Sequence, residues 1–231
     1  MEIIDRLSVR LILRDDEFVN THDIVKIVCG NAHISMLTRS GEVHTVGDNG
    51  RGQCEISEII KQSHIIDIES GGDHTISLDS TGKIHCWGSN RDGQSRNTNQ
   101  CIVPSIVNNK DVSSLTAGNY YSACSFDDGT AIVWGDNDDG QCEVPQDIHN
   151  IKSIHSGGET NIYCLTHDNT LHVWGNRKSN MNELLPDEYK RNIKSFHGGQ
   201  YHHLAVMTCG RVVGLGKGAV SYTHLTLPTK A

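Results

Sequence analysis

A motif of about forty residues recurs five times along the chain and constrains its fold more than any other feature. Each copy closes on a glycine, and these glycines follow one another at spacings of 41, 47, 40 and 41 residues. They are Gly47, Gly88, Gly135, Gly175 and Gly216. Repeats with a period of about 20–50 residues are supersecondary units that bury their apolar faces by stacking on their neighbours. The chain is therefore predicted to be an array of similar units.

Further positions recur inside each copy. Fourteen residues before the closing glycine stands a hydrogen-bonding residue, namely His33, His74, Tyr121, Asn161 or His202. Six residues before it stands Gly41, Gly82, Gly129, Asn169 or Gly210. Glycine, and after it asparagine, most readily adopts a positive φ, so this second position predicts a tight turn. Trp87, Trp134 and Trp174 directly precede three of the closing glycines.

Each unit begins with a short apolar segment, which predicts a strand. These segments are Ile24–Val28, Ile65–Ile68, Val112–Leu115, Ile151–Ile154 and Ile193–Phe196. Beyond the closing glycine, the first three units carry Gly52-Gln53, Gly93-Gln94 and Gly140-Gln141. We predict at least three short strands in each unit, joined by glycine turns. A period of about forty residues filled with β-structure is typical of a propeller blade.

The motif G-x-x-H, a glycine turn and W-G-x-N-x-x-G-Q resembles the repeat of the regulator of chromosome condensation family. Asn49, Asn90 and Asn137 fill its asparagine position, and residues 134–145 are especially similar to its short form. A WD repeat would place Asp after Trp, whereas every Trp here precedes Gly. The resemblance covers residues 24 to about 218. It implies an all-β fold, a β-propeller of about five blades, as part of a seven-bladed ring.

Three segments follow from this reading. Residues 1–23 precede the repeats and are predicted to supply a strand that completes a blade. Residues 24–219 form the propeller repeats. Residues 220–231 continue no repeat position and resemble a translated cloning adapter, which we leave out of the fold prediction.

Composition narrows the class of partner. The formal net charge of −8 disfavours nucleic acid and anionic membranes, which clustered Lys and Arg would bind. No apolar run approaches the ~18 residues of a transmembrane helix, and the N-terminus does not resemble a secretory signal. The eight cysteines form no C-x-x-C pair, so free thiols and a cytoplasmic or nuclear location are expected.

The chemically active residue types favour structural roles. Tyr121 and Asn161 in the first recurring position would break a ring of metal-binding histidines. His44, His85 and His172 share another position with Ile132 and Val213, which argues against zinc. Asp136–Gly140 lacks the glycine and glutamate spacing of an EF-hand calcium loop. Cys54 and Cys142 occupy one position, with Ser95 in the second unit, and are predicted to be packing residues. No catalytic, cofactor-binding or metal-binding residue is predicted.

The leading functional prediction is a non-catalytic scaffold for protein–protein interaction, because fold alone does not fix function and loops differ most between copies. The most variable connectors are Ser95–Lys110 and Arg177–Arg191. The resemblance leaves two alternatives, nucleotide exchange on a small GTPase such as Ran, and the propeller portion of a larger ubiquitin ligase. The predicted partner is a protein, with a small GTPase as one option, rather than a membrane, a nucleic acid or a small-molecule substrate.

Overall fold

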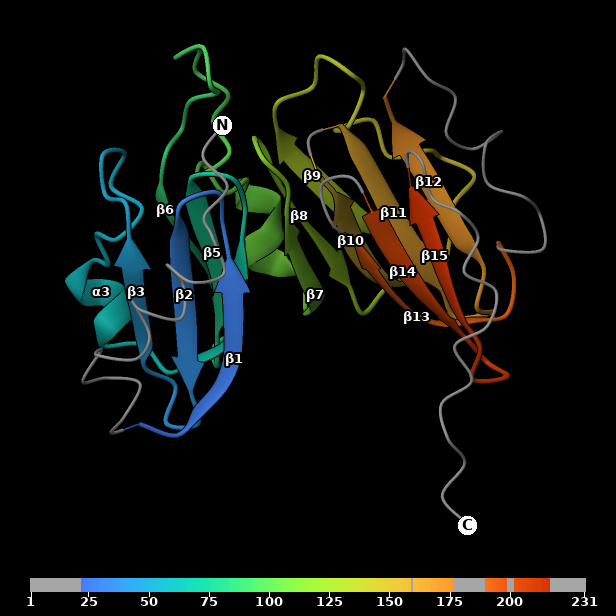
Figure 1. Cartoon of the computed structure of the whole chain (residues 1–231), viewed down its shortest axis with the longest axis horizontal. Coiled ribbons are helices and arrows are strands. Elements are labelled where there is room, and N and C mark those ends of the chain that lie inside the picture. The colour runs from blue at the N-terminus through green and yellow to red at the C-terminus, as the bar shows by residue number, and fades with distance from the viewer. Residues whose placement is uncertain (1–21, 159, 177–189, 199–201, 217–231) are drawn as a thin grey trace.

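The protein is represented by a computed structural model that describes residues 22–158, 160–176, 190–198 and 202–216 (Figure 1). The strands of this part form five antiparallel sheets of three strands each. In chain order the sheets comprise β1 (Ile24–Cys29), β2 (His33–Thr38) and β3 (Val43–Gly47); β4 (Ile65–Ser70), β5 (His74–Asp79) and β6 (Ile84–Gly88); β7 (Val112–Ala117), β8 (Tyr121–Phe126) and β9 (Ala131–Gly135); β10 (Ile151–Gly157), β11 (Asn161–Thr166) and β12 (Leu171–Gly175); and β13 (Ile193–Gly198), β14 (His202–Met207) and β15 (Val212–Gly216). We call these sheets blades one to five. Two short helices, α3 (Glu58–Lys61) and the 3₁₀-helix η1 (Ser105–Asn109), lie in the first two connectors.

The closing glycine ends each blade because it lies where the backbone of the neighbouring strand comes closest. It pairs with the hydrogen-bonding residue fourteen positions earlier, as Gly88 does with His74. Gly88 has a φ of 100°, and a Cβ there would lie 2.5 Å from the carbonyl oxygen of Asp73. Only glycine tolerates both conditions without strain.

The core of the protein is divided among the interfaces between blades. All six residues of the middle strands β2, β5, β8 and β11 are buried, because each of these strands lies between its own two sheet partners and the adjacent blades. One apolar cluster, for example, joins Ile76 and Leu78 of blade two to Leu115 and Phe126 of blade three. The fold therefore depends on blade-to-blade contacts rather than on one central core.

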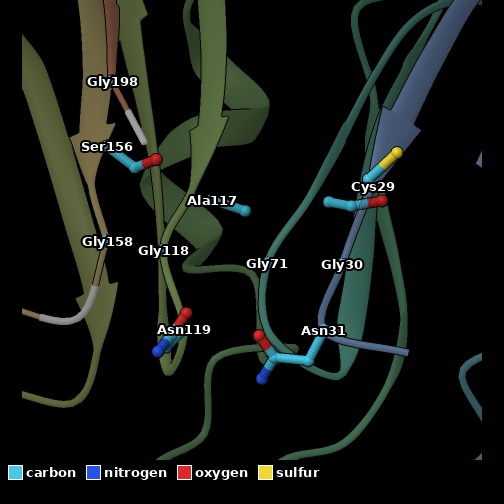
Figure 2. A pocket seen from close by; sticks show the side chains of 11 residues that line it. Cys29, Gly30, Asn31, Gly71, Ala117, Gly118, Asn119, Ser156, Gly158 and Gly198 are labelled. Carbon is cyan, nitrogen blue, oxygen red and sulfur yellow. The ribbon is translucent and has the colours of Figure 1, made fainter. Parts of the chain in front are cut away.

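The first strands of the five blades end around one shared cleft. The ends of these strands and the turns that follow line a cleft of about 230 Å³, to which all five blades contribute (Figure 2). Its lining side chains are short, as Asn31, Ala117 and Ser156 illustrate, and none of those described carries a charge. We assign no ligand to this cleft, since it offers neither charged groups nor aromatic surface.

The two outer blades of the described array each expose a face that the inner blades bury. Ile27 of blade one is 50% exposed, whereas its counterparts Ile68 and Phe196 are fully buried against the preceding blade. Leu204 of blade five is 54% exposed, whereas its counterpart Ile76 is fully buried against the following blade. The prediction of an all-β propeller with about five blades is confirmed, and the described blades form an open arc. Closure into a seven-bladed ring stays a prediction.

Candidate interaction surface

In the first three blades, the first recurring position links one blade to the next. The Nε2 atom of His33 lies 3.0 Å from the hydroxyl of Thr75 in blade two, and that of His74 lies 2.9 Å from the hydroxyl of Ser122 in blade three. The Tyr121 hydroxyl donates a hydrogen bond of 2.6 Å to the carbonyl of Asn161 in blade four. These buried side chains therefore contribute to the architecture. The side chain of His202 lies outside the described residues.

The glycine three positions earlier makes room for these rings. A Cβ on Gly71 would lie 2.2 Å from the His74 ring and 2.3 Å from the carbonyl oxygen of Gly118 in the next blade. The same close approach recurs at Gly30 with His33 and at Gly118 with Tyr121. The glycine of the G-x-x-H pattern is therefore required because a side chain at this position would overlap the ring three residues later and the backbone of the next blade.

The burial of these histidines makes stability depend on pH. Burial is the main reason that the pKa of His74 is lowered to about 3, and burial also lowers the pKa of His33. An unfolded chain takes up each proton near pH ~6.5, whereas the folded chain resists it, so stability is lost as the pH falls below that value. We expect His74 alone to cost about 2 kcal/mol of unfolding free energy between pH 7 and pH 5. Denaturant titrations at the two pH values measure this loss.

The matched variant for this prediction is His74→Tyr, because Tyr121 occupies the same position in blade three. Tyrosine does not titrate near this range, so the variant should show a shallower decline. Parallel pH profiles for the two proteins would contradict the role given to His74.

The tryptophans also join neighbouring blades. The indole nitrogens of Trp87, Trp134 and Trp174 donate hydrogen bonds of 3.1, 2.9 and 2.9 Å to carbonyl oxygens in the connector of the preceding blade. The acceptors are the backbone carbonyls of Gln53, Gln100 and Gln141. All three glutamines are fully buried. Each of these three connectors is therefore fixed by a hydrogen bond from a tryptophan of the next blade.

The second unit differs from the sequence prediction. Its buried glutamine is Gln100, whereas Gln94 of the Gly93-Gln94 pair is exposed. Asn99 takes the turn conformation with a φ of 61°, where Gly52 in the first unit has 77°. Pairing Ser95 with Cys54 and Cys142 was accordingly wrong.

Cys101 is the true counterpart of those two cysteines. Its backbone N–H donates to the Asn90 side chain at 2.7 Å, as that of Cys54 does to Asn49 and that of Cys142 to Asn137, both at 2.9 Å. The longer connector of this unit therefore holds an insertion before its structural glutamine.

The insertion forms an exposed loop, residues 91–99, which we call the unit-two loop. Within it, the buried Asp92 side chain accepts hydrogen bonds of 2.8 Å from the backbone N–H groups of Gln94 and Arg96. Residues 93–97 are all exposed. In Figure 1 this green segment extends beyond the end of β6. Local hydrogen bonds to Asp92 thus give the loop a defined shape without core packing.

Arg96 connects the unit-two loop to the next connector. Its guanidinium lies 3.0 Å from the Asp92 carboxylate and 3.2 Å from that of Asp136, and it also pairs with Asp138. The Arg96 side chain is nonetheless 52% exposed. On the other side, Arg51 donates to the Asp92 carbonyl at 3.2 Å. We call this end of the blades, with residues 48–54, 89–101 and 136–142, the connector face.

The other residues considered as metal ligands or catalytic groups do not gather at one site in the described structure. His85 pairs with Asp79 at 2.7 Å in the turn of blade two, at the end opposite the connector face. No group of three or more His, Cys, Asp or Glu residues in the described part of the chain could hold a metal ion. Residues 177–189 of the other variable connector lie outside the described ranges, as do residues 1–21 and 217–231. No helix among the described residues is long and apolar enough to cross a membrane.

Comparisons with known proteins agree with this geometry. The profile described as "Regulator of chromosome condensation (RCC1) repeat" matches residues 24–53 and 65–94. Human WBSCR16 is 17% identical over 88% of this chain, with a TM-score of 0.66. Yeast RCC1 (Prp20), solved with bound Kap60, is 17% identical over 84% of the chain, with a TM-score of 0.67. The ectodomain of the Physcomitrella patens receptor kinase CR4 is 18% identical over 87% of the chain, with a TM-score of 0.70.

The chain spans only part of the length of these proteins, 64% of WBSCR16, 56% of the yeast protein and 54% of the CR4 ectodomain. At this level of identity the likeness establishes the fold. A comparison with curated protein sequences gives no significant match. Together, the recurring positions and the five blades show that the chain is a β-propeller, and its first two blades match the profile of the regulator of chromosome condensation (RCC1) repeat.

Proposed function

We propose that the chain is a non-catalytic scaffold that binds a protein partner through its connector face. The observation that carries this proposal is the unit-two loop, an exposed insertion set on a connector whose Gln100 is fully buried. Binding residues are often found on loops that a rigid scaffold positions. The residues that recur in every blade build the propeller. A partner would therefore be recognised by the unit-two loop, which the first and third connectors lack.

Arg96 is the residue in this loop that we expect to contribute most to binding. Arginine is enriched among interface hot spots because its planar guanidinium forms several directed hydrogen bonds. The side chain is 52% exposed although it already faces carboxylates on two connectors. A partner can therefore contact an arginine whose orientation is already fixed.

Replacing Arg96 by serine is expected to weaken partner binding about tenfold or more, because truncated hot-spot arginines cost about 2 kcal/mol. The partner is first captured from a cell extract on the immobilised wild-type chain. It is then purified and titrated against the wild-type and variant chains to compare their Kd values.

The matched control is Arg39→Ser. Arg39 also forms an exposed ion pair, with Asp23 at 2.7 Å, but it follows β2 at the end of blade one opposite the connector face. It should bind the partner with wild-type affinity. Equal affinities for the two variants would place the interface elsewhere.

A small GTPase is the second candidate partner. The structure of Prp20p, the yeast protein of similar fold, is reported together with its binding to Gsp1p and histones. The test is the release of fluorescent GDP from Gsp1p with and without the chain. An unchanged rate is expected of a scaffold, and accelerated release would establish an exchange factor instead. The ubiquitin ligase alternative stays a prediction.

We propose an intracellular location for this role, in the cytoplasm or the nucleus. All eight cysteines are present as free thiols, which suits a reducing compartment. Fluorescent tagging of the chain in cells tests this location.

A further inference from the structure

Two cysteines of the second unit, Cys86 and Cys101, lie at the base of the unit-two loop, each near the backbone beside the other. The Cys86 thiol, on β6, donates to the carbonyl oxygen of Gln100 at 3.9 Å. The Cys101 thiol donates to the carbonyl oxygens of Trp87 and Ser89 at 3.6 and 3.4 Å. Each sulfur therefore contacts the backbone of the residue next to the other cysteine.

The Cys86 thiol also responds electrostatically to its neighbour. Its pKa is raised, chiefly by burial and then by a hydrogen bond to the Cys101 thiol. The crossed contacts to the backbone independently place both thiols at the end of β6.

This arrangement distinguishes the second unit from the first and third. Cys54 and Cys142 occupy the position of Cys101, with their thiols 3.4 Å from the corresponding carbonyls of Asp48 and Asp136. The position of Cys86, two residues before the closing glycine, holds other residues there, Thr45 and Val133. Of these three connectors, only the one with the insertion carries a pair of thiols.

We propose that Cys86 and Cys101 are a redox modification site, at which a reversible disulfide closes the unit-two loop. The oxidant is a low-molecular-weight disulfide such as oxidised glutathione. The Cys101 thiolate attacks one of its sulfurs and expels the first glutathione thiolate. Cys86 then loses its proton and attacks the Cys101 sulfur of the mixed disulfide, which expels the second thiolate. Two protein thiols and one glutathione disulfide thus become one protein disulfide and two glutathione thiols.

The order of attack follows from burial. Since burial raises the pKa of Cys86, its thiolate is scarce, and only thiolates attack disulfides. Cys101 lies in the connector and reacts first. The resulting bond would enclose Arg96 in a covalent loop and restrict the motion of the connector face. Oxidation would thereby set how freely the loop adapts to a partner, which goes beyond the scaffold role.

The experiment incubates the purified full chain with increasing ratios of oxidised to reduced glutathione. Free thiols are then blocked, and the protein is digested without reduction for mass spectrometry. We expect a peptide pair joined through Cys86 and Cys101 and lighter by two hydrogens than the reduced pair. Cys54 and Cys142 should carry glutathione or stay reduced. Accumulation of Cys101–glutathione without the internal link, or a Cys86 that stays reduced throughout, would overturn the proposal.

A second measurement follows the loop itself by amide hydrogen exchange. Oxidation should slow exchange across residues 91–97 in the wild-type chain and leave it unchanged in Cys86→Val. Val133 stands at the corresponding position of blade three, so blade two should fold with valine at position 86. Equal slowing in both proteins would contradict a role for the disulfide. Both readouts are independent of partner binding, so they stand or fall separately from the scaffold function.

Discussion

Gly71→Ala is expected to destabilise the protein by about 3 kcal/mol, through overpacking at a blade interface. The added Cβ would lie 2.3 Å from the Gly118 carbonyl oxygen, which belongs to the backbone of the next blade. Backbone cannot swing aside as a flexible side chain can, so the two blades would have to separate. For a chain of this size, the thermal midpoint should fall by about 6–12 °C. Differential scanning calorimetry measures the change.

Gly82→Ala is the control that separates lack of space from backbone conformation. Gly82 has a φ of 85°, but a Cβ there would meet nothing within 4 Å. We expect a cost of about 1 kcal/mol, the strain of a non-glycine residue in the left-handed region. Equal losses at Gly71 and Gly82 would show that the steric account of the G-x-x-H pattern is wrong.

Trp134→Ala is expected to cost about 3–5 kcal/mol of unfolding free energy, since it empties a buried aromatic site. Trp134 is 6% exposed and packs in the cluster shared by blades two and three. The alanine variant also loses the 2.9 Å hydrogen bond from the indole nitrogen to the Gln100 carbonyl. Equilibrium unfolding in urea measures the loss.

Trp134→Phe divides that loss into packing and hydrogen bonding. The Gln100 carbonyl still accepts a 2.9 Å hydrogen bond from the Ser122 hydroxyl, so it is not left unsatisfied. We therefore expect Trp134→Phe to cost only about 1–2 kcal/mol. If Trp134→Phe lowered the unfolding free energy as much as Trp134→Ala, the hydrogen bond of the indole N–H, rather than the packing of the aromatic ring, would hold the blades together.

The recurring positions made the blades predictable from sequence. The first three blade interfaces pose similar steric and hydrogen-bonding requirements. Residues such as His74, Gly82 and Trp87 therefore return at matching positions. Five copies of one local pattern outweigh the ambiguity of any single hairpin. The hydroxyl partners on the next blade, Thr75 and Ser122, were missed. They directly follow the recurring position, which is the signal that could have revealed them.

The structural glutamine of the second unit could not be assigned from the local motif. Gly93-Gln94 matches the motif, but the structure requires a backbone carbonyl that Trp134 can reach. The residue that supplies it is Gln100, 34 positions before Trp134. The cysteine that follows Gln53, Gln100 and Gln141 was the available signal. The contact between Arg96 and Asp136 likewise depends on how two blades pack, which local sequence does not encode.

The most direct test of the division between scaffold and recognition is to replace the unit-two loop. Residues 91–99 are exchanged for Gly-Arg-Gly, the sequence of residues 50–52 in the first unit, while Gln100 and Cys101 are kept. Loop length costs little, and the ion pairs of Arg96, whose side chain is 52% exposed, are expected to contribute little. The thermal midpoint should therefore change by no more than about 2 °C. Binding of the partner captured by the wild-type chain should be lost. Unchanged affinity in this variant, or loss of its cooperative melting, would contradict the claim that residues 91–99 recognise the partner and the repeated positions build the fold.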